Sequence, residues 1–187
     1  HPVLFENSGQ GGAGCRERAV AFAEEDWGVT THRWTLDSDP IGFAQAFGNF
    51  PGKVDRWQYY HMYVPSIAII DFGSAAAGAG AMDGNRDDCI QTYSCHFMTP
   101  VDEATTIDYW LHVRNFAPGD DSVTDGISEQ FRIAFAEDKI ILQAVQKSEQ
   151  RYGVDGRAGI DIDAGPGLFR HLVNKALRAE NPAEAAE

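Results

Sequence analysis

The feature that most constrains the fold is the run from Asp121 to Tyr152, which contains no proline and one glycine, Gly126. Because Pro118-Gly119 precedes this run and Gly153 follows it, the run predicts one long helix. Its apolar residues recur at steps of three and four, so they share one face of that helix. They are Ile127, Phe131, Ala134, Ile141, Leu142 and Val145. A helix with such a face packs against other secondary structure.

The chain before this helix contains short runs rich in aromatic and β-branched residues, separated by turn residues. Such runs predict antiparallel strands and hairpins. They cover residues 18–24, 29–36, 54–64, 66–74, 89–98 and 104–116. Shorter helices are predicted over Ile41–Phe47 and Gly165–Glu180. Strands followed by a long helix predict an α+β domain over residues 1–180, and the composition of residues 181–187 is typical of a flexible tail.

The length and charge of the chain restrict its class. A chain of 187 residues suits one domain, and 43% hydrophobic residues are enough to build its core. The net charge of −13 would repel nucleic acids and anionic membranes, which excludes both as expected partners. The least polar stretch, Val64–Met82, contains Asp71 and many small residues, so no membrane-spanning helix is expected.

The cysteines and the first residue indicate a compartment and a fragment. The three cysteines, Cys15, Cys89 and Cys95, form no C-x-x-C pair, which favours a reducing cytoplasm. The chain starts at His1 and has no signal peptide pattern. We therefore expect a cytoplasmic protein and a sequence that is a fragment.

One acidic residue, Asp138, interrupts the apolar stripe of the long helix. The stripe predicts that Asp138 is buried against the sheet, where a bare carboxylate is costly. Such a residue needs a cation, a hydrogen-bond network or a retained proton. From the pattern alone, a structural aspartate and a metal or catalytic aspartate are equally supported.

The histidines form no metal-binding spacing such as H-x-x-x-H; they are His1, His32, His61, His96, His112 and His171. In the strand from Thr105 to Val113 the odd positions are the more apolar, which predicts that they point inward. On this assignment His96 and His112 point away from the interior. The chain also contains neither a G-x-S-x-G nucleophile elbow nor a phosphate-binding loop.

Five runs of the chain, in this order, resemble a known family. They are Val54-Asp55-Arg56-Trp57-Gln58, His96-Phe97-Met98-Thr99-Pro100, Arg114-Asn115-Phe116, Phe135-Ala136-Glu137-Asp138 and Ile160-Asp161-Ile162-Asp163-Ala164-Gly165. They look like the C-terminal catalytic domain of Rieske non-heme iron oxygenases, in the vanillate O-demethylase branch, which is also similar to dicamba monooxygenase. The resemblance covers nearly the whole chain.

This resemblance implies a helix-grip (START/Bet v1-like) domain, whose curved antiparallel sheet surrounds the long helix and holds mononuclear Fe(II). The family's iron carboxylate corresponds to Asp138, and its second iron histidine corresponds to His1. The first histidine and the Rieske domain would lie upstream, since the C-x-H and C-x-x-H cluster motifs are absent here. Electrons would come from NAD(P)H through a reductase or ferredoxin and the [2Fe-2S] cluster, and the complete protein would form a homotrimer.

The implied reaction activates O2 at Fe(II) to hydroxylate or O-demethylate an aromatic substrate. The residues expected to contact that substrate are Gln91, Tyr93, Phe97, Tyr109 and Phe131. Because no Lys or Arg occupies these inward positions, the sequence predicts no charged anchor for an anionic substrate. The alternative is a non-enzymatic helix-grip module that binds an apolar small molecule without iron.

Overall fold

The computed structural model describes residues 16–17, 21–153 and 164–180. The strands in this part are β1 Arg16–Glu17, β2 Ala21–Glu25, β3 Gly28–Ser38, β4 Val54–Tyr63, β5 Ile67–Ala76, β6 Ile90–Pro100 and β7 Thr106–Arg114. The helices are α2 Gly42–Phe47, the short 3-10 helix η1 Ala81–Asp83, α3 Asp121–Tyr152 and α4 Ala164–Glu180. The long helix has the predicted bounds. The expected tail, 181–187, lies outside the described residues.

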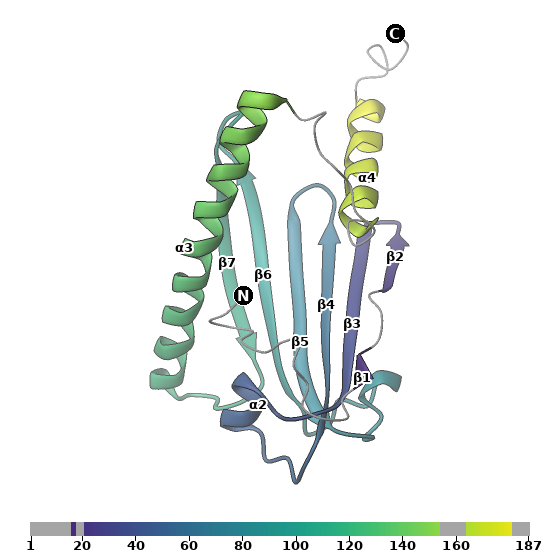
Figure 1. Ribbon diagram of the computed structural model, residues 1–187, viewed down its shortest axis with the longest axis vertical. Helices are drawn as coiled ribbons and strands as arrows, with labels where there is room; N and C mark the ends of the chain where they lie inside the picture. Colours follow the sequence, from purple (N-terminus) through teal and green to yellow (C-terminus); the bar gives the residue numbers. More distant parts are fainter. Residues whose placement is uncertain (1–15, 18–20, 154–163, 181–187) are drawn as a thin grey trace.

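The strands form one antiparallel, curved sheet in the order β1-β3-β4-β5-β6-β7, with β2 also paired to β3 (Figure 1). From β3 to β7 each strand pairs with the next strand of the chain. Helix α3 runs alongside β7 at one edge of the sheet. Helix α4 lies near β3, toward the opposite edge. This arrangement confirms the α+β prediction and its hairpins.

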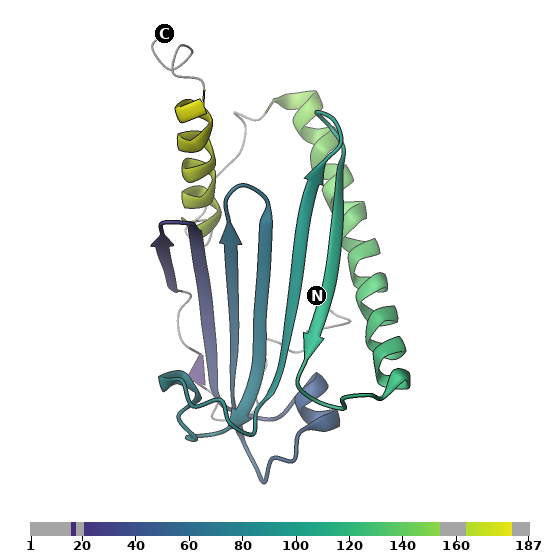
Figure 2. The same ribbon diagram turned by 180° about the vertical axis from the view of Figure 1, so that it is seen from behind.

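The two faces of the sheet differ in what covers them. We call the side that carries α2 and α3 the helix face, and the opposite side the open face; viewed from the open face, α2 and α3 lie behind the sheet (Figure 2). On the helix face, Phe43 of α2 packs near Phe72 of β5 and near Phe116, with ring centroids 6.4 and 5.6 Å away. No described helix has the length and apolar composition needed to cross a membrane.

A buried carboxylate stabilises the open face beside the loop between β5 and β6. Asp71, only 5% exposed, accepts hydrogen bonds from Trp57 Nε1 at 2.9 Å and Gln91 Nε2 at 2.8 Å. Arg86 pairs with its other oxygen at 2.7 Å and lies 4.6 Å from the centroid of the Trp57 ring. Because both oxygens have partners, the charge of Asp71 is compensated where burial alone would be costly.

The close approach of β5 to its neighbours requires glycine at position 73. A Cβ atom there would lie 2.4 Å from Trp57 Cζ2 and 2.6 Å from the carbonyl oxygen of Ile90. We expect Gly73→Ala to lower the free energy of unfolding by about 1–3 kcal/mol, because neither the buried ring nor the backbone can move away freely. Urea denaturation of the purified variant measures this loss.

A matched glycine provides the control for this prediction. Gly126 lies in α3, is exposed and has no atom within 4 Å of an added Cβ. Gly126→Ala should therefore raise the free energy of unfolding by about 0.5–1 kcal/mol, as helix propensity dictates. Equal stability of Gly73→Ala and the wild type would show that the sheet tolerates the added methyl group.

Candidate functional site

The first half of α3 packs onto the helix face through the predicted apolar stripe. Ile127, Phe131 and Ala134 are buried, and Phe131 is only 2% exposed. Asp120 caps the helix, since its side chain accepts hydrogen bonds from the backbone N–H groups of Ser122 and Val123. The cap and the buried stripe together fix α3 over β6 and β7.

Four polar side chains lie on the helix face beneath α3, and we call them the histidine cluster: Ser94, His96, Asp108 and His112. The Ser94 hydroxyl lies 2.9 Å from His96 Nε2 and 2.8 Å from His112 Nε2. His96 Nδ1 lies 2.8 Å from Asp108 Oδ2. The pairing of Ser94 with His112 across β6 and β7 brings these groups together.

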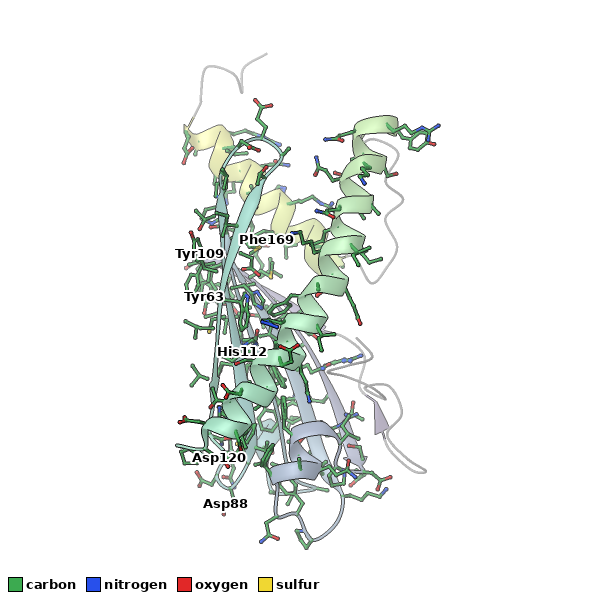
Figure 3. All side chains as sticks on the ribbon, turned by 90° about the vertical axis from the view of Figure 1, so that its left-hand side faces the viewer. Tyr63, Asp88, Tyr109, His112, Asp120 and Phe169 are labelled. Carbon is green, nitrogen blue, oxygen red and sulfur yellow. The ribbon has the colours of Figure 1, made fainter. Side chains whose placement is uncertain are left out.

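Aromatic side chains of α3 cover this cluster. The ring of His112 stacks on Phe131 with centroids 3.6 Å apart, and Figure 3 labels His112 at this position. Phe135 lies 5.3 Å from the His96 ring and 5.2 Å from the Trp110 ring. The prediction that His96 and His112 point away from the interior is therefore wrong.

The distances within the cluster allow one continuous hydrogen-bond chain. In that arrangement His96 Nδ1–H donates to Asp108, the Ser94 hydroxyl donates to His96 Nε2, and His112 Nε2–H donates to the Ser94 oxygen. Burial, and secondarily the nearby His96, lowers the pKa of His112 from 6.5 to about 4. His112 therefore stays neutral at physiological pH.

The lowered pKa of His112 predicts an acid-sensitive fold. Between pH 6.5 and about 4 the unfolded chain binds a proton at His112 that the folded chain does not, so stability falls as the pH falls through this window. We expect His112→Phe, which keeps an aromatic ring against Phe131, to lose less stability between pH 7 and pH 5 than the wild type. Urea midpoints at the two pH values measure this difference.

The control for this measurement is His171→Gln, because His171 is exposed on α4. This variant should keep the acid sensitivity of the wild type. A His112→Phe protein that loses as much stability as the wild type would contradict the role assigned to His112.

Asp138 is exposed, so the prediction that it is buried is wrong. Helical spacing correctly identifies its face, because Asp138 follows Ala134 and Phe135 by one turn on the side that carries Phe131. The described part of the chain, however, covers this face only as far as Ala134. Ile141 and Leu142, further along the same helix, are 64% and 67% exposed. The periodicity of apolar residues indicates which face of the helix is apolar, but it does not indicate how far along the helix the sheet covers that face.

The expected metal site lies only partly within the described residues. Within 16–17, 21–153 and 164–180, no group of three His, Cys, Asp or Glu side chains could hold a metal ion. His1, the expected second ligand, lies outside the described residues. Asp138 is an exposed acid, and it lies one helical turn beyond the aromatic side chains that cover the histidine cluster. A carboxylate is a suitable ligand for such a metal site.

The predicted substrate-contacting face was also assigned wrongly. Gln91, Tyr93, Phe97 and Tyr109 lie on the open face. Figure 3 shows Tyr109 on the side of the sheet away from α3. Its side chain is 58% exposed. Gln91 donates to Asp71 and to the Tyr93 hydroxyl there. The odd positions of β7 are the more apolar ones, but apolarity does not tell which face α3 covers. Phe131, in contrast, lies on the interior side as predicted.

A pocket opens on the helix face between α2 and the strands β3 to β6. The space between its lining atoms measures about 590 Å³ when the part that is open solvent is counted. Phe43 and Phe72 contribute apolar walls, and two cations, Arg33 and Arg56, line it from neighbouring strands. The expectation that no charged anchor is available does not hold for this pocket.

Sequence reasoning missed these arginines and the histidine cluster. The available signal was alternation, because Arg33 and Arg56 occupy the positions of β3 and β4 that face the same side as Phe72. Choosing the even face of β6 and β7 would have placed Ser94, His96 and His112 toward the helix as well. The histidine cluster was thus missed through the wrong choice of face in β6 and β7, whereas no face had been assigned to the strands that carry the arginines.

Comparisons with known proteins identify similar chains. The model of the vanillate O-demethylase oxygenase C-terminal domain matches residues 1–179. The toluene-4-sulfonate monooxygenase system iron-sulfur subunit of Comamonas testosteroni is 32% identical over 158 residues, which are 84% of this chain and 46% of that protein. A vanillate O-demethylase oxygenase subunit of Pseudomonas sp. (strain ATCC 19151) is 32% identical over 132 residues, 71% of this chain and 40% of that protein.

The fold is also found in a solved structure. The crystal structure of apo dicamba monooxygenase has a TM-score of 0.71 and 18% sequence identity, and the match covers 94% of this chain and 52% of that one. This likeness supports the fold alone. The present chain spans less than half the length of the two curated relatives described above.

Proposed function

Because the chain belongs to the vanillate O-demethylase oxygenase C-terminal domain family, we propose that it is the catalytic domain of a Rieske-type terminal oxygenase. The observation that carries this proposal is the family match over residues 1–179, which includes Asp138 and the strands beneath α3. The proposed reaction is hydroxylation or O-demethylation of an aromatic substrate by O2.

The proposed metal site uses Asp138 and His1, with a further histidine upstream of this chain. Two histidines and one carboxylate are the donors that non-heme Fe(II) oxygenases use, and they leave positions open. When bound, the iron supplies activation of dioxygen. The exposure of Asp138 supports this role, because a metal ion can reach an exposed carboxylate.

The other side chains of the helix face would prepare the space beside Asp138. Phe131, Phe135 and Trp110 would exclude water and pack against an aromatic ring. The neutral His112 and the chain from Asp108 through His96 to Ser94 offer hydrogen-bond donors and acceptors to a bound molecule. These residues would orient the substrate.

The partners are part of the same proposal. One relative is named as an iron-sulfur subunit of a toluene-4-sulfonate monooxygenase system, and another as a vanillate O-demethylase oxygenase subunit. By analogy, electrons would reach this domain from NAD(P)H through a reductase or ferredoxin and a [2Fe-2S] cluster outside this chain. A cytoplasmic homotrimer completes the proposal.

The test uses the complete protein that contains this chain. Iron analysis should give about three atoms per subunit, two from the cluster and one from the mononuclear site. With a reductase and a panel of methoxylated and methylated aromatics, product formation should depend on O2. A protein without iron that still binds aromatic compounds would instead support the alternative, a non-enzymatic binding module.

A further inference from the structure

Asp108 connects the histidine cluster to solvent. It lies on β7, the last strand of the sheet, and its side chain is 40% exposed, whereas that of His96 is 12% exposed and Ser94 is buried. Contacts of 2.8, 2.9 and 2.8 Å link Asp108 through His96 and Ser94 to His112. A group at the edge of the sheet is thus joined to a ring that stacks on Phe131 beneath α3.

The carboxylate of Asp108 sets the direction of this chain. A carboxylate only accepts hydrogen bonds, so His96 donates to it from Nδ1. A neutral imidazole with its proton on Nδ1 has an acceptor at Nε2, and the Ser94 hydroxyl therefore donates there. A hydroxyl has one hydrogen, so the Ser94 oxygen accepts from Nε2–H of His112. Each donor and acceptor in the chain thus follows from Asp108.

The consequence at the far end is a bare Nδ1 atom on His112. Burial lowers the pKa of His112 to about 4, so its ring carries one proton, and that proton lies on Nε2. In the described part of the chain no group hydrogen-bonds to this Nδ1, and no buried side-chain nitrogen or oxygen there lacks a partner. Nδ1 is therefore accessible, and it can accept a hydrogen bond from a bound molecule.

The surroundings of His112 are aromatic. Phe131 stacks on its ring, and the Phe135 ring lies 6.2 Å from it between centroids. Asp138 follows Phe135 by one helical turn, about 4.5 Å along the axis at about 1.5 Å per residue. His112 thus lies beneath the face of α3 that carries the proposed metal ligand. A ring bound there would pack against phenylalanine and meet an acceptor rather than a donor.

From these observations we propose that Asp108 is a positioning residue: through His96 and Ser94 it fixes His112 as a hydrogen-bond acceptor, so that the site prefers a molecule that presents an O–H or N–H group. Asp108 acts only through the chain and does not contact that molecule. That the molecule is the substrate of the oxygenase rests on the proposed function, whereas the direction of the chain does not.

Neutron diffraction of the complete protein locates the exchangeable hydrogens directly. Crystals are grown in heavy water at pH 8, which is above the usual pKa of histidine. We expect deuterium on Nδ1 of His96, on Nε2 of His112, and on the Ser94 hydroxyl in the direction of His96. Nδ1 of His112 should carry none. This measurement needs no variant and no turnover, so it depends neither on the folding of a variant nor on the proposed reaction.

Reversing the chain should reverse the preference for ligands. Lysine only donates, so Asp108→Lys would donate to Nδ1 of His96 and turn each later hydrogen bond around, which places a hydrogen on Nδ1 of His112. Isothermal titration compares indole, which only donates, with acetophenone, which only accepts. Because one hydrogen bond has a modest net effect, the ratio of the two affinities should shift toward acetophenone by about threefold to tenfold.

Two further variants are the controls. Glutamate keeps the acceptor, so Asp108→Glu should keep the wild-type ratio of affinities. Asp125→Lys makes the same change of charge at an exposed position of α3 and should also keep that ratio. A merely structural role of Asp108 would weaken the binding of both compounds alike and leave their ratio unchanged.

The outcomes separate this proposal from the proposed function. Deuterium on both nitrogens of His96, deuterium on Nδ1 of wild-type His112, an unshifted ratio in Asp108→Lys, or no binding of either compound would overturn the proposal. A shifted ratio in a complete protein that forms no product would refute the oxygenase function and leave the role of Asp108 standing. Product formation together with an unshifted ratio would do the reverse.

Discussion

Replacing Asp138 with Asn should lower the iron content of the complete protein by about one atom per subunit and leave the two irons of the cluster in place. An amide is a poor Fe(II) ligand, so turnover should fall below about one hundredth of the wild-type rate, more than is expected for the loss of a residue that only supports a metal ligand. Metal analysis and the signal of the reduced cluster in electron paramagnetic resonance separate the two sites.

The exposure of Asp138 makes this experiment decisive between the two interpretations of the residue. Replacing a structural aspartate that is hydrogen-bonded in the core would lower the free energy of unfolding. Replacing an exposed metal ligand would not. We therefore expect Asp138→Asn to unfold at the urea concentration of the metal-free wild type. Glu129→Gln, on the same helix, is the control and should keep iron and activity. Full iron content in Asp138→Asn would refute the assignment.

The chain of 187 residues should give no product by itself, even when it is folded and supplied with Fe(II), NAD(P)H and a reductase. Its sequence contains neither C-x-H nor C-x-x-H, so it has no residues for the Rieske cluster that would deliver electrons. The expected loss is complete, because without the cluster there is no route for electrons to the metal.

The assay compares formaldehyde release from methoxylated aromatics by this chain and by the complete protein at equal concentration. Circular dichroism and urea denaturation of the chain establish that it is folded, so that a lack of product is not due to unfolding. Comparable formaldehyde release by the two proteins would contradict the electron-transfer argument and require a different oxidant.

The fold was predictable because its elements depend on local signals. Proline and glycine mark the ends of α3, and aromatic and β-branched runs mark β4 to β7. The orientation of the sheet was less predictable. In β7 the odd residues, such as Tyr109, are more apolar than the even ones, yet α3 packs on the even face through His112. The His112 ring stacks on Phe131 and also hydrogen-bonds to Ser94, so it behaves as both apolar and polar. A pattern that classes each residue as either polar or apolar cannot predict this.

The candidate site required information that spacing along the chain does not contain. His112 and Ser94 meet only because β6 and β7 pair in one particular register. From the sequence alone, Arg33 is expected to be a solvent-exposed residue of a strand. Only the structure shows that α2 lies over that part of the sheet. The apolar stripe and the family resemblance both select Asp138 as a candidate ligand, but neither carries information about these neighbours.

The order of the strands separates the histidine cluster from the pocket arginines along the chain. The histidine cluster, the aromatic side chains above it and Asp138 all come from one continuous segment, Ser94–Asp138, which forms a hairpin followed by a helix. The pocket arginines come from an earlier hairpin, β3 and β4. Exchanging the segment 90–138 between relatives as one block would therefore transplant the histidine cluster together with Asp138 and leave the pocket arginines unchanged. The surroundings of Asp138 and the arginines of the pocket can in this way change independently of each other.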